Sequence, residues 1–123
     1  MEIDDVEFEK LVAEALDALP EEFQRHLQNV DVAIAPAPTM EQLRSVGVRG
    51  PHTLFGLYEG VPLTERGTYT PATPDMITIF REPLIRDCAS PAALREQVRR
   101  TVLHEIAHFF GISDDRLHEL GAY

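Results

Sequence analysis

Basic residues and long apolar segments are both scarce in this sequence. Lys and Arg total 11 against 21 Asp and Glu, which gives a formal net charge of −10. Phosphate backbones attract basic surfaces and repel acidic ones, so no nucleic-acid partner is expected. The same acidity disfavours anionic membrane surfaces, and no apolar run approaches the ~20 residues that a membrane-spanning helix needs. We therefore expect no membrane association.

The sequence has a single cysteine, and its N-terminal stretch does not have the pattern of a secretory signal. Cys88 is the only cysteine, so no intrachain disulfide can form and a reducing cytosol is the expected location. The N-terminal stretch MEIDDVEFEK is acidic, where a secretory signal would be basic and then apolar. We therefore expect a cytoplasmic protein in which Cys88 is a small packing residue rather than a nucleophile.

The length and the apolar content of the chain indicate a globular fold. The chain has 123 residues, of which 44% are hydrophobic, enough for one core. No repeat, low-complexity tract or linker divides it. We expect a single domain over residues 1–123 and a monomer.

Periodicity and capping signals predict the elements of the first half. Apolar residues recur at helical spacing after Asp4 and Asp5, which can cap a helix. Thr39 and Gln42 match a capping box. The predicted elements are a helix over residues 5–19, a short turn near residues 23–27, a strand over 30–35, and a short helix that begins after Thr39 and stops at Gly47.

The second half predicts two strands followed by the longest helix. The segments TLFGLYEG and MITIF (Met76 to Phe80) have the β-branched and aromatic content of short strands. Ser90-Pro91 opens a helix, and Gly111 ends it. A last helix is expected over residues 115–120. This order predicts an α+β domain in which a small mixed sheet packs beside a helix.

The sequence HEIAH, from His104 to His108, places two histidines four residues apart on this helix. Residues with that spacing lie on one face with their side-chain roots ~5–6 Å apart, so both imidazoles can reach one Zn²⁺ ion. Glu105 is turned about 100° around the helix axis from His104. There its carboxylate can take a proton from a water molecule that zinc acidifies. The spacing predicts His104 and His108 as metal ligands and Glu105 as the catalytic base.

The alternative is that His104 and His108 are ordinary histidines on a packing helix. The context favours the metal site, because the pattern falls on a capped helix with an apolar opposite face. Three of the five histidines also lie in the last twenty residues. We interpret the other two, His26 and His52, as surface histidines.

A third protein ligand is expected, since a catalytic zinc ion usually takes three and keeps a fourth position for water. Gly111 can turn the chain back after His108, and Asp114 is the next suitable donor. The complete string is H-E-x-x-H-x-x-G-x-x-D, so Asp114 is preferred. Alternatively, Glu119 or His118 could reach back from the final helix, a donor could come from upstream, and Asp114 could only cap that helix.

These residues are similar to those of known zinc peptidases. HEIAHFFGISD resembles the motif of the aspzincins, whose third zinc ligand is an aspartate. From Leu54 onward the chain resembles a family of short bacterial zincin-like proteins that are candidate zinc metallopeptidases. The resemblance implies a minimal zincin fold, with His104, His108 and Asp114 as zinc ligands and Glu105 as the base. The segments of this chain that resemble the family are LFGLYEGVPLTERG, PDMITIFREPL and VRRTVLHEIAHFFGISDDRLHELG.

We therefore expect a zinc-dependent peptidase that acts on peptides or flexible segments. An extended peptide would pair with an edge of the sheet, offered by TLFGLYEG or by MITIF. Two alternatives stay open: a metal-binding module without useful turnover, and another zinc hydrolase such as a nuclease, which the net charge disfavours. A tyrosine or an arginine could stabilise the oxyanion, and the candidates are Tyr58, Tyr69, Arg66 and Arg116. For each of them we prefer a surface or structural role.

Overall fold

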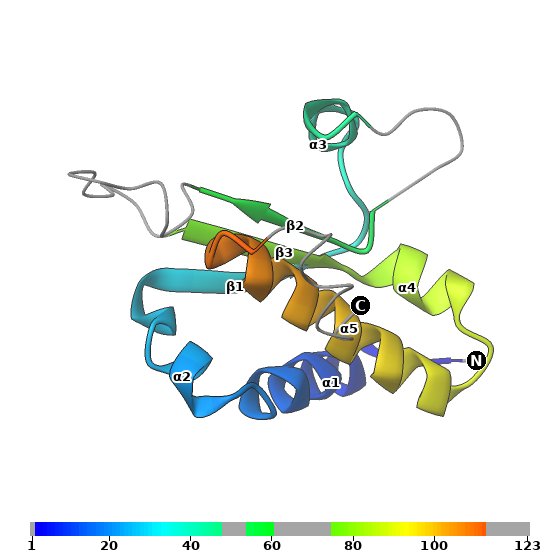
Figure 1. Ribbon diagram of the computed structural model, residues 1–123. Coiled ribbons are helices and arrows are strands. Elements are labelled where there is room, and N and C mark those ends of the chain that lie inside the picture. Colours follow the sequence, from blue (N-terminus) through cyan, green and yellow to red (C-terminus); the bar gives the residue numbers. More distant parts are fainter. Residues whose placement is uncertain (1, 48–53, 61–74, 113–123) are drawn as a thin grey trace.

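The computed structural model describes residues 2–47, 54–60 and 75–112, and it has the predicted α+β fold (Figure 1). The described strands form a small sheet, and helices lie on either side of it. In chain order the elements are α1 (Asp5–Asp17), α2 (Glu21–Gln24), the 3-10 helix η1 (Leu27–Asn29), β1 (Val30–Ala35), α3 (Met40–Ser45), β2 (Gly56–Glu59), β3 (Asp75–Phe80), α4 (Arg81–Asp87) and α5 (Pro91–Phe109).

The sheet is mixed, as predicted, and its described strands have the order β1-β3-β2. β1 runs parallel to β3, from Val30 opposite Asp75 to Ala35 opposite Phe80. β2 runs antiparallel to β3, with Gly56 opposite Ile79. β3 is therefore the central strand, and the prediction that MITIF could offer an exposed edge is wrong. The physical reason is burial, since β3 is apolar and largely covered on both faces.

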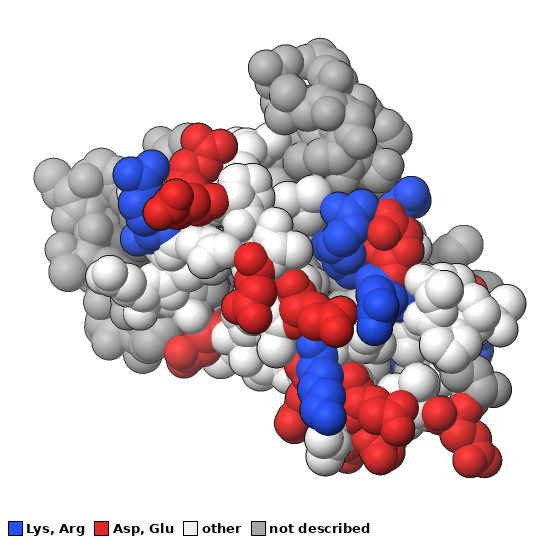
Figure 2. Space-filling model, turned by 90° about the horizontal axis from the view of Figure 1, so that it is seen from below, with Lys and Arg blue, Asp and Glu red and all other residues white. Residues whose placement is uncertain are grey.

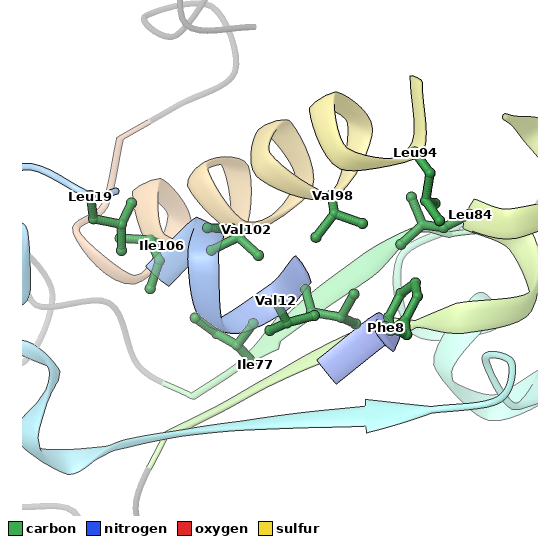
Figure 3. Close-up of a cluster of buried hydrophobic side chains, with 11 residues drawn as sticks. Phe8, Val12, Leu19, Ile77, Leu84, Leu94, Val98, Val102 and Ile106 are labelled. Atoms are coloured by element: carbon green, nitrogen blue, oxygen red, sulfur yellow. The ribbon is translucent and has the colours of Figure 1, made fainter. Parts of the chain in front are cut away.

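Helices α1 and α5 cover one face of the sheet, whereas α3 lies on the opposite side (Figure 1). The buried side chains of this core come from α1 and the residue Leu19 after it, from the central strand, and from α4 and α5 (Figure 3). Full burial of one aliphatic side chain contributes ~1.5–3 kcal/mol, so this core fixes α5 against the sheet. The most deeply buried members include Phe8, Ile77, Ile79, Leu84, Leu94, Val98 and Ile106, each 0% exposed.

Helix α5 begins at the predicted cap. The hydroxyl of Ser90 accepts a hydrogen bond from the N–H of Ala93 at 3.1 Å, and Pro91 is the first helical residue. The apolar stripe Leu94, Val98, Val102 and Ile106 is buried. The sequence therefore determines both the start of α5 and its rotation about its own axis. That rotation sets where the two histidines of the last turns point.

Replacing Ser90 by alanine is expected to lower the free energy of unfolding by about 1 kcal/mol, because the first turn of α5 loses a side-chain acceptor. Urea unfolding measures the change. Ser45→Ala is the control, since this exposed hydroxyl donates to the carbonyl of Gln42 near the end of a short helix. Surface changes of that kind usually stay within ~0.5 kcal/mol. Equal effects of the two substitutions would contradict the capping role of Ser90.

Helix α4, over Arg81–Asp87, was not among the predicted elements. It follows β3 without a loop, and no side chain caps its start. Packing and long-range contacts hold it instead: Pro83 and Leu84 are buried, and the N–H of Glu82 donates to the carbonyl of Pro36 at 2.9 Å. Arg81 also forms an ion pair with Asp5 at the start of α1.

Candidate metal centre

The two histidines lie in the last turns of α5, on the side of the helix that is not packed into the core. Their side chains are 21% exposed for His104 and 35% exposed for His108. Ile106, between them in the sequence, is fully buried in the core. The helix thus separates an apolar face, which anchors it, from a partly exposed face that carries both imidazoles.

The imidazoles and the carboxylate of Glu105 converge. The ring centroids of His104 and His108 are 4.4 Å apart, and the ring planes meet at 70°. Oε1 of Glu105 lies 3.3 Å from Nδ1 of His108, and Oε2 lies 4.0 Å from Nε2 of His104. The structure therefore brings together the three residues that the sequence motif singled out.

This group could hold a metal ion. One candidate ligand atom from each of His104, Glu105 and His108 can be chosen so that all lie within 4.8 Å of one another. Imidazole nitrogens and carboxylate oxygens are donors that zinc accepts in proteins. Two imidazoles from adjacent helical turns thus fit a metal ion, while the carboxylate between them offers either a ligand or a base.

Glu105 differs from the histidines in its burial. It is 6% exposed, although it carries a carboxylate. Its side-chain stem lies against the main chain of Gly56 in β2, since a Cβ atom at position 56 would be 3.1 Å from Cγ of Glu105. Sequence reasoning did not identify this contact. The available signal was an isolated glycine inside a strand pattern, which often marks a close approach of another element.

Gly111 ends the helix in the predicted way. It has a φ of 77°, in the left-handed region that suits glycine. Its N–H donates to the carbonyl of His108 at 2.9 Å, and the N–H of Ile112 donates to that of Ala107 at 2.9 Å. These two bonds form a Schellman motif, which turns the chain away from the helix axis directly after the second histidine.

The expected third ligand lies outside the described residues. This holds for Asp114 and for the alternatives Glu119 and His118, as well as for the predicted helix over residues 115–120. The candidate oxyanion residues Arg66, Tyr69 and Arg116, and also His52, lie outside them too.

Tyr58, the described oxyanion candidate, has structural contacts. Its hydroxyl donates a hydrogen bond to Oδ2 of the buried Asp75 at 2.8 Å. Its ring packs edge-on against Phe109, with centroids 5.9 Å apart. Phe109 is itself 2% exposed and belongs to the core. These contacts favour the structural interpretation of Tyr58.

Cys88 is a packing residue, as predicted. It is half-buried and packs against the hydrophobic core. Burial raises the pKa of its thiol, and the nearby charge of Asp87 raises it further. A thiol with a raised pKa is a weak nucleophile at neutral pH because the thiolate is the reactive form.

The fold and this site define a class of protein. A small mixed sheet beside a helix that carries a His-Glu-His group is a zincin-like module with a candidate metal site. The sequence matches the zincin-like metallopeptidase family over residues 27–122. The chain belongs to this family, which confirms the resemblance to zincin-like proteins seen in the sequence.

Solved structures add a likeness in fold. A conserved hypothetical protein from Thermo thermophilus is 21% identical, with a TM-score of 0.52 over 93% of this chain and 94% of its own chain. No curated protein matches the sequence. Among the described helices, none has both the length and the apolar character that crossing a bilayer requires.

Proposed function

We propose that this protein is a zinc-dependent peptidase that hydrolyses peptide bonds in small or flexible peptides. The observation that carries the proposal is the convergence of His104, Glu105 and His108 at the end of α5, in a chain of the zincin-like metallopeptidase family. The site combines a metal-binding pair with a carboxylate that is held beside it.

In this proposal His104 and His108 are zinc ligands. Asp114 is the third ligand, because Gly111 turns the chain after His108 and Asp114 is the next carboxylate along it. Glu119 and His118 are the alternatives. A metal held by three protein donors keeps a position open for water or substrate, which catalysis requires.

A zinc ion held by these residues would supply Lewis-acid chemistry, since bound zinc can polarise a carbonyl oxygen and lower the pKa of a water molecule to about 7. The role of Glu105 is to move the proton: an Oε atom accepts it from the attacking water and donates it to the nitrogen of the leaving amine. The position of Glu105 suits this role, since both carboxylate oxygens face imidazole nitrogens at 3.3 and 4.0 Å.

The substrate is proposed to extend along β2. The N–H of Phe80 donates to the carbonyl of Phe55 at 2.8 Å. In an antiparallel ladder the bonded residues alternate, so the main-chain groups of Gly56 point away from β3. Gly56 is also the β2 residue that contacts Glu105. Gly56 is itself buried, whereas Tyr58 is partly exposed and Glu59 is exposed. A peptide that paired with this edge would therefore bind at the Tyr58 and Glu59 end of β2, next to the contact between Gly56 and the proposed base.

The surface charges support a peptide rather than a nucleic acid as substrate. Figure 2, which views the molecule from below, shows basic side chains beside acidic ones. Arg95 pairs with Glu14 of α1 at 3.3 Å, and Glu96 pairs with Arg99 at 2.7 Å and with Arg100 at 3.0 Å. Hydrogen bonds from these two arginines lower the pKa of Glu96 to about 2. The basic residues of α5 are thus partnered by carboxylates and do not form a phosphate-binding stripe.

The test is to purify the protein without chelator, measure its bound metal, and then assay a peptide library and single-stranded DNA and RNA. We expect one zinc ion per chain and cleavage of peptides only. Stoichiometric zinc without any cleavage would identify a metal-binding module instead. Cleavage of nucleic acid would identify a different hydrolase, and failure to bind zinc at micromolar concentrations would contradict the proposal.

The identity of the third ligand gives a separate prediction. Asp114→Ala is expected to weaken zinc affinity at least ~10-fold more than Glu119→Ala, because removal of a ligand costs more than removal of an outer group. Competition with a chromophoric chelator measures both affinities at one pH. A larger loss of zinc affinity in Glu119→Ala would assign the third ligand to Glu119. Equally small losses in both variants would leave His118 or an upstream donor as the third ligand.

A further inference from the structure

Strand β2 and helix α5 approach each other so closely beside the histidines that a side chain at position 56 would force its neighbours to shift. A Cβ atom there would lie 2.9 Å from Cγ2 of Thr101, 3.1 Å from Cγ of Glu105 and 3.3 Å from the main-chain oxygen of Thr78. Carbon atoms normally pack ~3.5–4.0 Å apart. The main chain of Gly56 therefore lies against both helical side chains.

Two sides of this contact are rigid. The hydroxyl of Thr101 donates a hydrogen bond to the carbonyl of Gln97 at 2.8 Å, which fixes the direction of its methyl group. Gly56 belongs to a strand that pairs with the central strand β3, and its partner Ile79 is fully buried. Neither the methyl group nor the strand can move easily.

The third side is the flexible stem of Glu105. Thr101 and Glu105 are four residues apart, so they lie on the same face of α5 in adjacent turns. A glutamate has three rotatable side-chain bonds, and it keeps several rotamers unless its neighbours restrict it. Here the stem lies next to the Thr101 methyl group and against the Gly56 main chain.

We infer that Gly56 and Thr101 are positioning residues, which form a slot that holds the stem of Glu105 and keeps its carboxylate beside His104 and His108. The inference rests on the proposed function, in which Glu105 must stay within reach of the water that it deprotonates. It explains how a carboxylate that is 6% exposed keeps a defined position between two partly exposed imidazoles. The slot acts on the base and leaves the two histidines untouched.

The main test is Gly56→Ala. The added methyl group meets two rigid neighbours and one flexible stem, so Glu105 is displaced. A misplacement of ~1 Å can lower turnover ~10²-fold, and we expect kcat to fall ~10–100-fold while zinc affinity stays within ~3-fold. Val12→Ala is the matched control, because Val12 is a core residue of α1 that is 5% exposed and lies outside the slot. The assays are run at a temperature well below the thermal unfolding midpoints of both G56A and V12A.

Thr101→Ser gives a second variant and a rescue. It removes Cγ2, the atom nearest to the added methyl group, and retains the hydroxyl that bonds to Gln97. Alone it widens the slot, so Glu105 is expected to gain rotamers and kcat to fall a few-fold. In the double variant G56A/T101S the alanine methyl refills this space. We therefore expect the double variant to be more active than G56A.

Nuclear magnetic resonance of the zinc-free protein separates this inference from the proposed function. We expect contacts between the Hα protons of Gly56 and the Hγ protons of Glu105 in the wild type, with one dominant Glu105 rotamer. G56A and T101S are expected to redistribute that rotamer, and V12A is not. The Glu105 rotamer populations test the slot even if no variant cleaves any peptide. A complete absence of cleavage would refute only the proposed function.

Two outcomes would overturn the inference. One is an unchanged Glu105 rotamer in both G56A and T101S. The other is an active wild type together with a G56A variant whose kcat falls no more than that of V12A. If G56A does not fold, T101S and the double variant still provide the rotamer comparison.

Discussion

Peptide cleavage by the Glu105→Gln variant is expected to fall ~10²–10⁴-fold, the usual contribution of a general acid–base group. This corresponds to about 2.7–5.4 kcal/mol in activation free energy. Glutamine has nearly the same shape, so it still fits between Gly56 and Thr101 and still contacts His108. It cannot accept the proton from water. Zinc affinity is therefore expected to stay within a few-fold of that of the wild type.

The measurement is kcat/KM on the best peptide from the library, with zinc content determined for each preparation. Glu96→Gln is the matched control, because Glu96 lies on the same helix with its side chain 47% exposed. Its surface ion pairs are worth only ~0–1 kcal/mol, and cleavage should not change. A Glu105→Gln variant that retained more than about a tenth of wild-type activity would contradict the role of Glu105 as base.

The largest expected effect on metal binding is that of His108→Ala. Loss of an outer-shell partner of a metal ligand typically weakens metal affinity ~10–100-fold, so loss of a ligand itself is expected to weaken it by more than ~100-fold. Alanine favours the helix, and the His108 side chain is 35% exposed. The zinc-free variant should therefore fold normally. The affinity change then reports on the lost nitrogen alone.

Chelator competition at constant pH measures this affinity, because protons compete with the metal for imidazole. His26→Ala is the control. His26 is an exposed histidine whose ring packs edge-on against Phe110, with centroids 5.6 Å apart, and it is not a member of the His104-Glu105-His108 group. Equal zinc affinities of His108→Ala and His26→Ala would refute the assignment of His108.

The sequence predicted the bounds of α5 and the face that carries His104 and His108, because the information lies within the helix. Ser90-Pro91 and Gly111 mark its ends, and the stripe from Leu94 to Ile106 determines the buried face. Once that face is buried, His104 and His108 must project from the other side. The capping box of Thr39 and Gln42 is local in the same sense, and both of its hydrogen bonds form, at 3.0 and 2.9 Å.

The sequence did not predict α4 or the sheet order, because both depend on contacts between distant segments. α4 lacks a side-chain cap, carries Pro83 in its first turn, and is held by burial and by the bond from Glu82 to Pro36. The strand patterns predicted β1, β2 and β3 individually. Their alternation cannot specify that β3 lies between the other two.

Gly56 illustrates the same limit within the site. Its position in TLFGLYEG is compatible with a bulge, a bend or a close approach, and only the packing of β2 on α5 decides among them. The contact with Glu105 joins residues that are far apart in the chain. Motif spacing can therefore identify a base and its metal ligands, but it does not identify the residues that hold the base.

The most direct test of the proposed metal centre is X-ray absorption spectroscopy at the zinc edge on the protein loaded with one equivalent of zinc. We expect two imidazole nitrogens at ~2.0–2.1 Å with oxygen donors completing the shell. We also expect His108→Ala to lose one of the two imidazoles. A wild-type protein that binds no stoichiometric zinc, or a spectrum without two imidazole ligands, would contradict the assignment of this site.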